Sequence, residues 1–224
     1  MPAPLAVIVA AFNEADRLPA TLAALGRTFP GARVLVADDG SRDGTDHAAL
    51  QHGAELVRSP VTIGKGGAAT LAAERLLDGP APAIVVLCDG DLGESATELA
   101  RLAAAVQDGA ADLAIGAFAR RVGGGVGAAR GFSRWASRRL GCVALEAPIS
   151  GQRALRGDML PTLLPFAPRF GMETAMNIDA ARAGYRIVEV ALDLEHRTTG
   201  RTPGGFLHRF RQLGDFAAVY LDRR

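Results

Sequence analysis

Two aspartates separated by one glycine follow a strongly apolar run in the segment VVLCDGD, residues 85–91. Asp89 and Asp91 can converge on a hard divalent cation, because Mg²⁺ and Mn²⁺ take oxygen ligands and usually complete their shell with phosphate and water. The alternative is a turn, since Asp-Gly pairs are common in turns. The motif alone leaves a metal site and a turn both open.

Similar polar clusters follow two other apolar runs. Asn13–Glu14 comes after the run 5–11, and Asp38–Asp39 ends the run 32–39. Asp39 has the chemistry to hydrogen-bond a base or a ribose, although Asx-turn and N-cap roles are the more ordinary use of such a residue. One cluster of this kind is typical of a turn, whereas three such clusters, each at the end of an apolar run, form a pattern.

The segment GKGG, residues 64–67, opens an Ala- and Leu-rich helical pattern. Small residues allow close approach of the backbone, and a helix N-terminus favours phosphate. The P-loop spacing and the complete dinucleotide-binding fingerprint are both absent. The segment therefore indicates phosphate binding only in combination with the acidic clusters.

The first half of the chain alternates between strand and helix patterns. Near-continuous apolar runs predict buried parallel strands over 5–11, 32–39, 54–59, 83–91 and 111–118. Helical spacing predicts helices over 15–28, 64–78 and 95–109, with Ser95 and Glu98 spaced as a capping box. This order predicts an α/β fold with a mostly parallel, Rossmann-like sheet covered by helices on both faces. Ligands bind such sheets at the carboxyl ends of the strands.

After residue 118 the alternation stops. A Gly- and Arg-rich stretch at 120–141 becomes a basic helix, and its glycines at 123–131 are typical of a loop over a site. We expect a short strand and a helix start within 148–160, a helix over 170–185 and a strand over 186–197. A basic amphipathic helix is expected at 206–224. The pattern shows no second-domain linker, so we expect a single domain over 1–224.

Composition excludes several classes of protein. The net charge of +1 gives no reason to expect nucleic-acid binding. Cys88 and Cys142 lack metal-site spacing and do not make a disulfide framework, which favours a reducing compartment. The first residues resemble a strand and not a signal peptide, and no apolar stretch approaches the roughly 20 residues that span a bilayer. We expect a cytoplasmic protein, with a peripheral membrane contact and a homodimer both left open.

Read in order, AAFNEADRL, VADDGSRDGT, GKGGA and LCDGDL resemble the family 2 glycosyltransferases, whose fold is the GT-A nucleotide-sugar-binding fold. The resemblance covers nearly the whole chain and implies a donor half over 1–118 and an acceptor half over 119–224. It implies that FNE lines the nucleotide pocket, that DDGS binds base and ribose, and that D-x-D binds the metal and diphosphate. The implied donor site comprises Ala11, Phe12, Glu14, Asp39, Lys65, Asp89 and Asp91.

The second half, with ISGQRALR and GYRIVEVALDLEHRTTGRT, is similar to the branch of dolichyl- and polyprenyl-phosphate sugar synthases. That similarity implies that Arg153 and Arg197 lie near phosphates. His196 stands where that branch usually has an aspartate, and resembles the metal ligand of glucosyl-3-phosphoglycerate and mannosylglycerate-type synthases. FGME, residues 170–173, is similar to their acceptor side. The resemblance thus implies His196 as third metal ligand and Glu173 as the candidate base.

These features predict a glycosyltransferase that uses Mg²⁺ or Mn²⁺ and a UDP- or GDP-sugar, with Asp91, Glu173, Arg153 and Arg197 as catalytic groups. A small soluble acceptor is the leading expectation, and a lipid phosphate at a membrane surface is the alternative, which the C-terminal helix suits. A nucleotide-binding module without catalysis is a further alternative. A sugar-nucleotide pyrophosphorylase is disfavoured, because the loop FNEADR lacks glycine.

Overall fold

The protein is described here by a computed structural model, in which residues 4–118, 128–141, 143–194, 214–215 and 218–223 are placed. One seven-stranded sheet has the order β3-β2-β1-β4-β6-β5-β7. Only β6 runs antiparallel to its neighbours β4 and β5 among the pairs of this sheet. The strands are β1 (Leu5–Ala11), β2 (Arg33–Asp38), β3 (Glu55–Arg58), β4 (Ile84–Asp89), β5 (Leu113–Phe118), β6 (Arg153–Arg156) and β7 (Ile187–Leu192). The predicted mostly parallel α/β sheet is confirmed.

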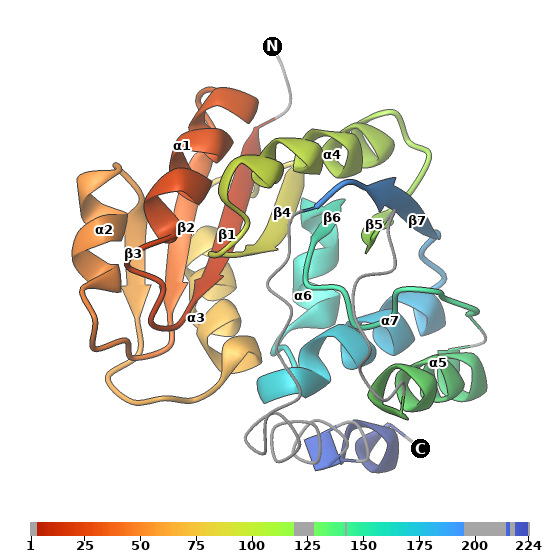
Figure 1. The fold of residues 1–224 in the computed structure, drawn as a ribbon. Coiled ribbons are helices and arrows are strands. Elements are labelled where there is room, and N and C mark those ends of the chain that lie inside the picture. Colours follow the sequence, from red (N-terminus) through yellow and green to blue (C-terminus); the bar gives the residue numbers. More distant parts are fainter. Residues whose placement is uncertain (1–3, 119–127, 142, 195–213, 216–217, 224) are drawn as a thin grey trace.

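Helices cover both faces of the sheet (Figure 1). The alternating side chains of β1 show this, because Val7 and Val9 enter one buried cluster while Ala6 and Ile8 enter the other. The first cluster is closed by α1 (Leu18–Thr28), α2 (Thr45–Gln51) and α4 (Leu99–Gln107). The second is closed by α3 (Lys65–Leu77), α6 (Leu160–Leu163) and α7 (Met172–Arg182), and α5 (Ala128–Gly141) packs on α7. No described helix is both long and apolar enough to cross a membrane.

The start of the fourth helix differs from the predicted capping box. Residues Gly93–Glu98 form a 3-10 helix, and the α-helix begins only at Leu99. Ser95 donates its hydroxyl proton to the carbonyl of Leu92 at 2.7 Å and does not cap a helix N-terminus. The capping-box prediction was therefore wrong, because the Ser95 hydroxyl binds a carbonyl within its own turn and not a backbone amide at the start of a helix.

The later elements follow the predicted order, with shorter bounds. The 3-10 helices Gly157–Met159 and Arg169–Gly171 precede α6 and α7, so the predicted helix 170–185 is α7 with its preceding turn. The strand predicted over 186–197 ends at Leu192. Of the predicted C-terminal helix, residues 214–215 and 218–222 are described as helical. The glycines of 123–127 lie outside the described residues.

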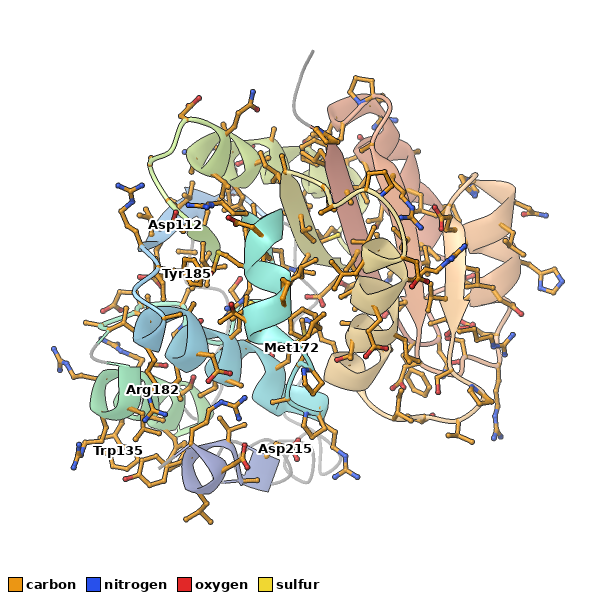
Figure 2. The ribbon with its side chains drawn as sticks, turned by 180° about the vertical axis from the view of Figure 1, so that it is seen from behind. Asp112, Trp135, Met172, Arg182, Tyr185 and Asp215 are labelled. Carbon is orange, nitrogen blue, oxygen red and sulfur yellow. The ribbon has the colours of Figure 1, made fainter. Side chains whose placement is uncertain are left out.

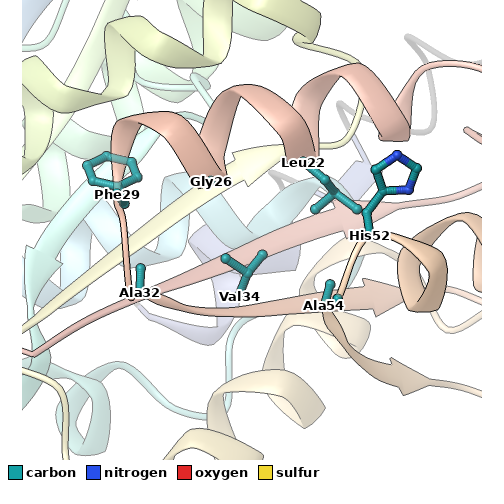
Figure 3. A pocket seen from close by; sticks show the side chains of 9 residues that line it. Leu22, Gly26, Phe29, Ala32, Val34, His52 and Ala54 are labelled. Atoms are coloured by element: carbon teal, nitrogen blue, oxygen red, sulfur yellow. The ribbon is translucent and has the colours of Figure 1, made fainter.

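A pocket of about 180 Å³ lies between α1 and the beginnings of β2 and β3 (Figure 3). The residues that line it include Leu22, Phe29, Val34 and His52. Because it lies at the amino ends of these strands, it is at the opposite edge of the sheet from Asp89 and Asp91. The pocket therefore does not belong to the acidic site.

Candidate functional site

The three polar clusters meet at one edge of the sheet. β1 lies between β2 and β4, and its last residues pair with theirs: Ala11 with Asp38 and Ala10 with Asp89. The amide of Asp39 donates to the carbonyl of Ala11 at 3.0 Å, and the amide of Gly90 donates to Ala10 at 2.9 Å. The expectation that these clusters share the carboxyl edge is confirmed.

A charged cluster surrounds Asp89 at this edge. The Nζ of Lys65 lies 2.6 Å from Asp89 Oδ1 and 2.9 Å from Glu173 Oε1. The Nε2 of Gln152 donates to Asp89 Oδ2 at 2.7 Å. Lys65 begins α3, Glu173 lies in the first turn of α7, and Gln152 precedes β6. Four segments far apart in the sequence thus bring two carboxylates, one ammonium and one amide together.

The charge of Lys65 is fixed by its two carboxylate neighbours. Burial alone lowers the pKa of Lys65. The charges of Asp89 and Glu173 raise the pKa by more than burial lowers it, so the pKa of Lys65 lies above its ordinary value. Burial beside Asp89 also raises the pKa of the Cys88 thiol, which keeps it neutral. The cluster therefore presents a permanent positive charge at the end of β4 and no reactive thiolate at Cys88.

Gly151 lets the loop before β6 approach this cluster. A Cβ at position 151 would lie 2.3 Å from Lys65 Nζ and 2.8 Å from Asp89 Oδ2. Both distances are far below an ordinary carbon contact. Only glycine at this position allows the ion pair and the loop to coexist as observed.

Gly151→Ala is expected to lower transfer activity by about 10- to 100-fold, because displacing a reacting-site group by about 1 Å can have that effect. The fold should be retained, since the clash falls on the movable end of a lysine side chain. Steady-state kinetics and thermal melting measure the two effects. Gly26→Ala is the matched control, because a Cβ there meets nothing within 4 Å. A Gly151→Ala enzyme with normal activity would contradict this role.

Asp91 lies beside Arg17, with 3.7 Å between Asp91 Oδ2 and Arg17 Nη1. Asp89 and Asp91 supply hard oxygen donors on one turn, which fits Mg²⁺ or Mn²⁺ with phosphate and water completing the shell. Within the described part of the chain, no group of three His, Cys, Asp or Glu side chains forms a metal cluster. His196 and Arg197 lie outside the described residues, so their assigned roles stay predictions.

Asp39 shapes the entrance to α3. It is 6% exposed, and its carboxylate accepts the amides of Ile63 at 2.7 Å and Gly64 at 2.9 Å. Gly64 has φ +88°, a conformation that favours glycine. Asp39 therefore holds the turn that delivers Lys65 to Asp89, and its contact with a base or ribose stays a prediction.

The loop after β1 is tied to the loop after β2. The amide of Asn13 donates to Ser41 Oγ at 2.8 Å, and the amide of Glu14 donates to Thr45 Oγ1 at 2.9 Å. Ala11 is buried, whereas the Phe12 ring is 48% exposed at the carboxyl edge. Ala11, the last residue of β1, and the loop residues Phe12 and Glu14 thus lie near Asp39, and their contact with a nucleotide stays a prediction.

Arg153, the first residue of β6, is held inside the protein. Its guanidinium is fully buried and donates to the carbonyls of Ser150 at 2.9 Å and Pro148 at 3.1 Å, and to Asn177 Oδ1 at 2.8 Å. Burial lowers its pKa to about 10, so it stays charged at neutral pH. These contacts anchor the loop 148–152 to α7. The structure thus gives Arg153 a positioning role, and contact with a phosphate stays a prediction.

Three contributors were missed in the sequence: Gln152 and Gly151, which touch the Lys65–Asp89 pair, and Arg17, which approaches Asp91. Gly151 and Gln152 stand within the quoted motif ISGQRALR, but nothing in their spacing indicated Asp89 as a neighbour. Their position follows from the antiparallel pairing of β6 with β4, which joins Leu87 to Arg153.

Sequence comparison gives a family and several relatives. The family model described as glycosyl transferase family 2 matches residues 6–149. The undecaprenyl-phosphate mannosyltransferase of Micrococcus luteus is 32% identical over 87% of this chain and 85% of its own length. The polyprenol monophosphomannose synthase of Mycolicibacterium smegmatis is 30% identical over 87% of this chain and 78% of its own length.

Structural comparison finds glucosyl-3-phosphoglycerate synthase from Mycobacterium tuberculosis. Its complex with Mn²⁺, UDP and glucosyl-3-phosphoglycerate is 25% identical, with a TM-score of 0.78 over 99% of this chain and 80% of that chain. Its complex with Mg²⁺ and UDP is 26% identical, with a TM-score of 0.79 over 99% and 79%. This chain therefore shares the fold of those synthases over nearly its full length.

Proposed function

The chain belongs to glycosyl transferase family 2 and is a glycosyltransferase, and from this premise we propose that it transfers a hexosyl group from a nucleoside-diphosphate sugar to a polyprenyl phosphate. The observation that carries the proposal is the Lys65–Asp89 ion pair at the carboxyl edge, beside Asp91. Carboxylates and a fixed ammonium at the end of a central parallel strand suit a metal-bound diphosphate.

The donor side has a distinct role for each group. Asp89 and Asp91 would hold Mg²⁺ or Mn²⁺, which would supply positive charge to stabilise the departing nucleoside diphosphate. Lys65 adds a positive charge at the same edge. The loop with Phe12 and the carboxylate of Asp39 border the nucleotide. The complexes of glucosyl-3-phosphoglycerate synthase with UDP and either Mn²⁺ or Mg²⁺ support this assignment.

The acceptor follows from the chemistry and from the relatives. In transfer to a phosphate, an acceptor oxygen bonds to the anomeric carbon as the bond to the nucleoside diphosphate breaks, and the electron pair leaves with the diphosphate. An ionised phosphate oxygen needs no protein base. Glu173, the candidate base, is bound to Lys65 at 2.9 Å, which suits a phosphate acceptor. The names of the two relatives, both acting on polyprenyl lipids, support the same choice.

A small phosphorylated soluble acceptor is the second candidate. It is favoured by the structural match to a synthase solved with phosphoglyceric acid, at 26% identity and a TM-score of 0.78. Transfer to a hydroxyl with inversion would need a base, and Glu173 would then have to leave Lys65; in a retaining reaction the leaving diphosphate could take the proton. The sequence favoured this class of acceptor, whereas the curated relatives favour the lipid phosphate.

Calorimetric titration of UDP and GDP, each with and without Mn²⁺, tests the donor site. We expect one nucleotide to bind at least about 10-fold more tightly with the metal. Transfer of radiolabelled hexose to undecaprenyl phosphate in detergent, compared with 3-phosphoglycerate, then tests the acceptor. Label in the lipid fraction supports the proposal, and label in phosphoglycerate alone supports the second candidate. Absence of nucleotide binding under every condition would overturn both.

A further inference from the structure

One surface of α5 is exposed and carries aromatic and basic side chains. Along α5 the residues Ser133, Ala136 and Ser137 are buried, and Ser133 Oγ lies 2.7 Å from Thr174 Oγ1 of α7. The opposite stripe faces outward, and the helical residues 218–222 lie beside it. We call this surface the α5 face; it comprises Arg134, Trp135, Arg138, Arg139, Tyr220 and Leu221.

The apolar part of the α5 face is large and held in place. Trp135 is 48% exposed and Leu221 is 68% exposed. The Trp135 ring packs at a tilt against Tyr220, with centroids 4.8 Å apart, and against Phe132, with centroids 5.4 Å apart. Figure 2 shows Trp135 at the outer edge of the molecule, beside the C-terminal helix. Two other rings thus hold the indole of Trp135 in place at the surface. No further described element covers its exposed part, which has the amphipathic character of a membrane anchor.

The charge of the α5 face is one-sided. The helix Ala128–Gly141 contains arginine but no acidic residue. Arg134 pairs with the exposed Glu146 at 2.6 Å, whereas Arg138 and Arg139 make no ion pair with any residue that the structure describes. Asp222, next to Leu221, is paired with Arg223 at 3.1 Å. The exposed charge around Trp135 is therefore mainly cationic.

We propose that the α5 face docks on a membrane surface that contains anionic lipids. Tryptophan and tyrosine prefer the headgroup level of a bilayer, and arginines beside them bind lipid phosphates while their stems stay in the apolar layer. Figure 1 shows α5 and the C-terminal helix at the end of the molecule toward which β1 and β2 point. Docking there brings the carboxyl edge toward the lipid. The inference rests on the proposed polyprenyl-phosphate acceptor, which resides in a membrane.

Co-sedimentation of the full chain with vesicles tests this proposal. Wild-type protein should bind vesicles of phosphatidylcholine mixed with phosphatidylglycerol, bind phosphatidylcholine alone weakly, and lose binding as salt rises. The double variant Arg138→Glu/Arg139→Glu should bind the anionic vesicles at least about 10-fold more weakly. Leu221→Ser, at an exposed position whose change leaves the fold intact, should also weaken binding. Leu50→Ser is the matched control, because Leu50 is 59% exposed on α2, outside this face.

Equal binding of wild type and the two α5-face variants, or no binding to anionic vesicles, would overturn the docking surface. Transfer to undecaprenyl phosphate in detergent separates this failure from that of the proposed function. Transfer without vesicle binding would leave the proposed function standing and remove only the docking surface. If the wild type binds anionic vesicles, both variants lose this binding, and no transfer to undecaprenyl phosphate occurs, the docking surface is supported. The same result counts against the proposed polyprenyl-phosphate acceptor.

Discussion

Asp89→Asn should lower kcat/KM for sugar transfer by at least about 100-fold, the effect typical of removing one group that stabilises charge at a reacting centre. The substitution keeps the shape of the side chain but removes the charge that faces Lys65 at 2.6 Å. Among the described residues, Glu173 would then be the one remaining ion-pair partner of Lys65, and a divalent cation held by Asp89 and Asp91 would lose one carboxylate. Steady-state kinetics over a range of Mn²⁺ concentrations measures the loss.

The same variant should lose the metal-dependent part of nucleotide binding. A calorimetric titration that gives the same nucleotide affinity with and without Mn²⁺ would show this loss directly. Asp108→Asn, at the C-terminal end of α4, provides a matched charge change outside the cluster and should behave as wild type. Wild-type kinetics in Asp89→Asn at every metal concentration would remove Asp89 from the metal site.

The position of Asp89 was predictable because it depends on rules that act locally. A buried apolar run predicts a strand, strands alternating with helices predict a parallel sheet, and parallel strands end at a common edge. The register of β1 with β2 and β4 then brings the clusters after each strand together. These steps need no knowledge of residues 119–224.

The partners of Asp89 were not predictable by the same rules. Gly151 and Gln152 reach it because β6 inserts antiparallel between β4 and β5. A short strand was predicted within 148–160, but nothing in the sequence indicated its place or direction in the sheet. Glu173 was chosen by resemblance alone, and its ion pair with Lys65 depends on how α7 packs against the start of α3. Long-range packing, which spacing along the chain does not encode, decides these contacts.

Ser95 and Arg153 show two further limits of sequence reasoning. Ser95 and Glu98 have the correct spacing for a capping box, but the hydroxyl binds the carbonyl of Leu92 in a 3-10 turn. For Arg153, the family pattern identified the residue, but it did not indicate the contacts with Ser150, Pro148 and Asn177. In both cases the sequence pattern pointed to the residue. The hydrogen bonds that its side chain makes in the folded protein could not be read from that pattern.

Arg153→Lys should destabilise the protein by about 2–4 kcal/mol, because each buried acceptor left without a donor costs about 1–3 kcal/mol. A lysine ammonium at the end of a single stem does not reproduce the fork that reaches Ser150, Pro148 and Asn177. Asn177 Nδ2 also donates to Pro148 O at 2.8 Å, so that carbonyl keeps one partner. Urea unfolding measures the change in free energy of unfolding.

Arg156→Lys is the matched control for this prediction. Arg156 lies on the same strand, but it is exposed and pairs with Asp112 and Asp158 at the surface. Exposed ion pairs contribute about 0–1 kcal/mol, so this variant should change stability little. If Arg153 instead served a substrate phosphate, Arg153→Lys would unfold like wild type while kcat/KM fell. A large loss of stability in Arg153→Lys, together with a weaker dependence of activity on metal, would identify Arg153 as the residue that holds the loop 148–152, and with it Gln152, against Asp89.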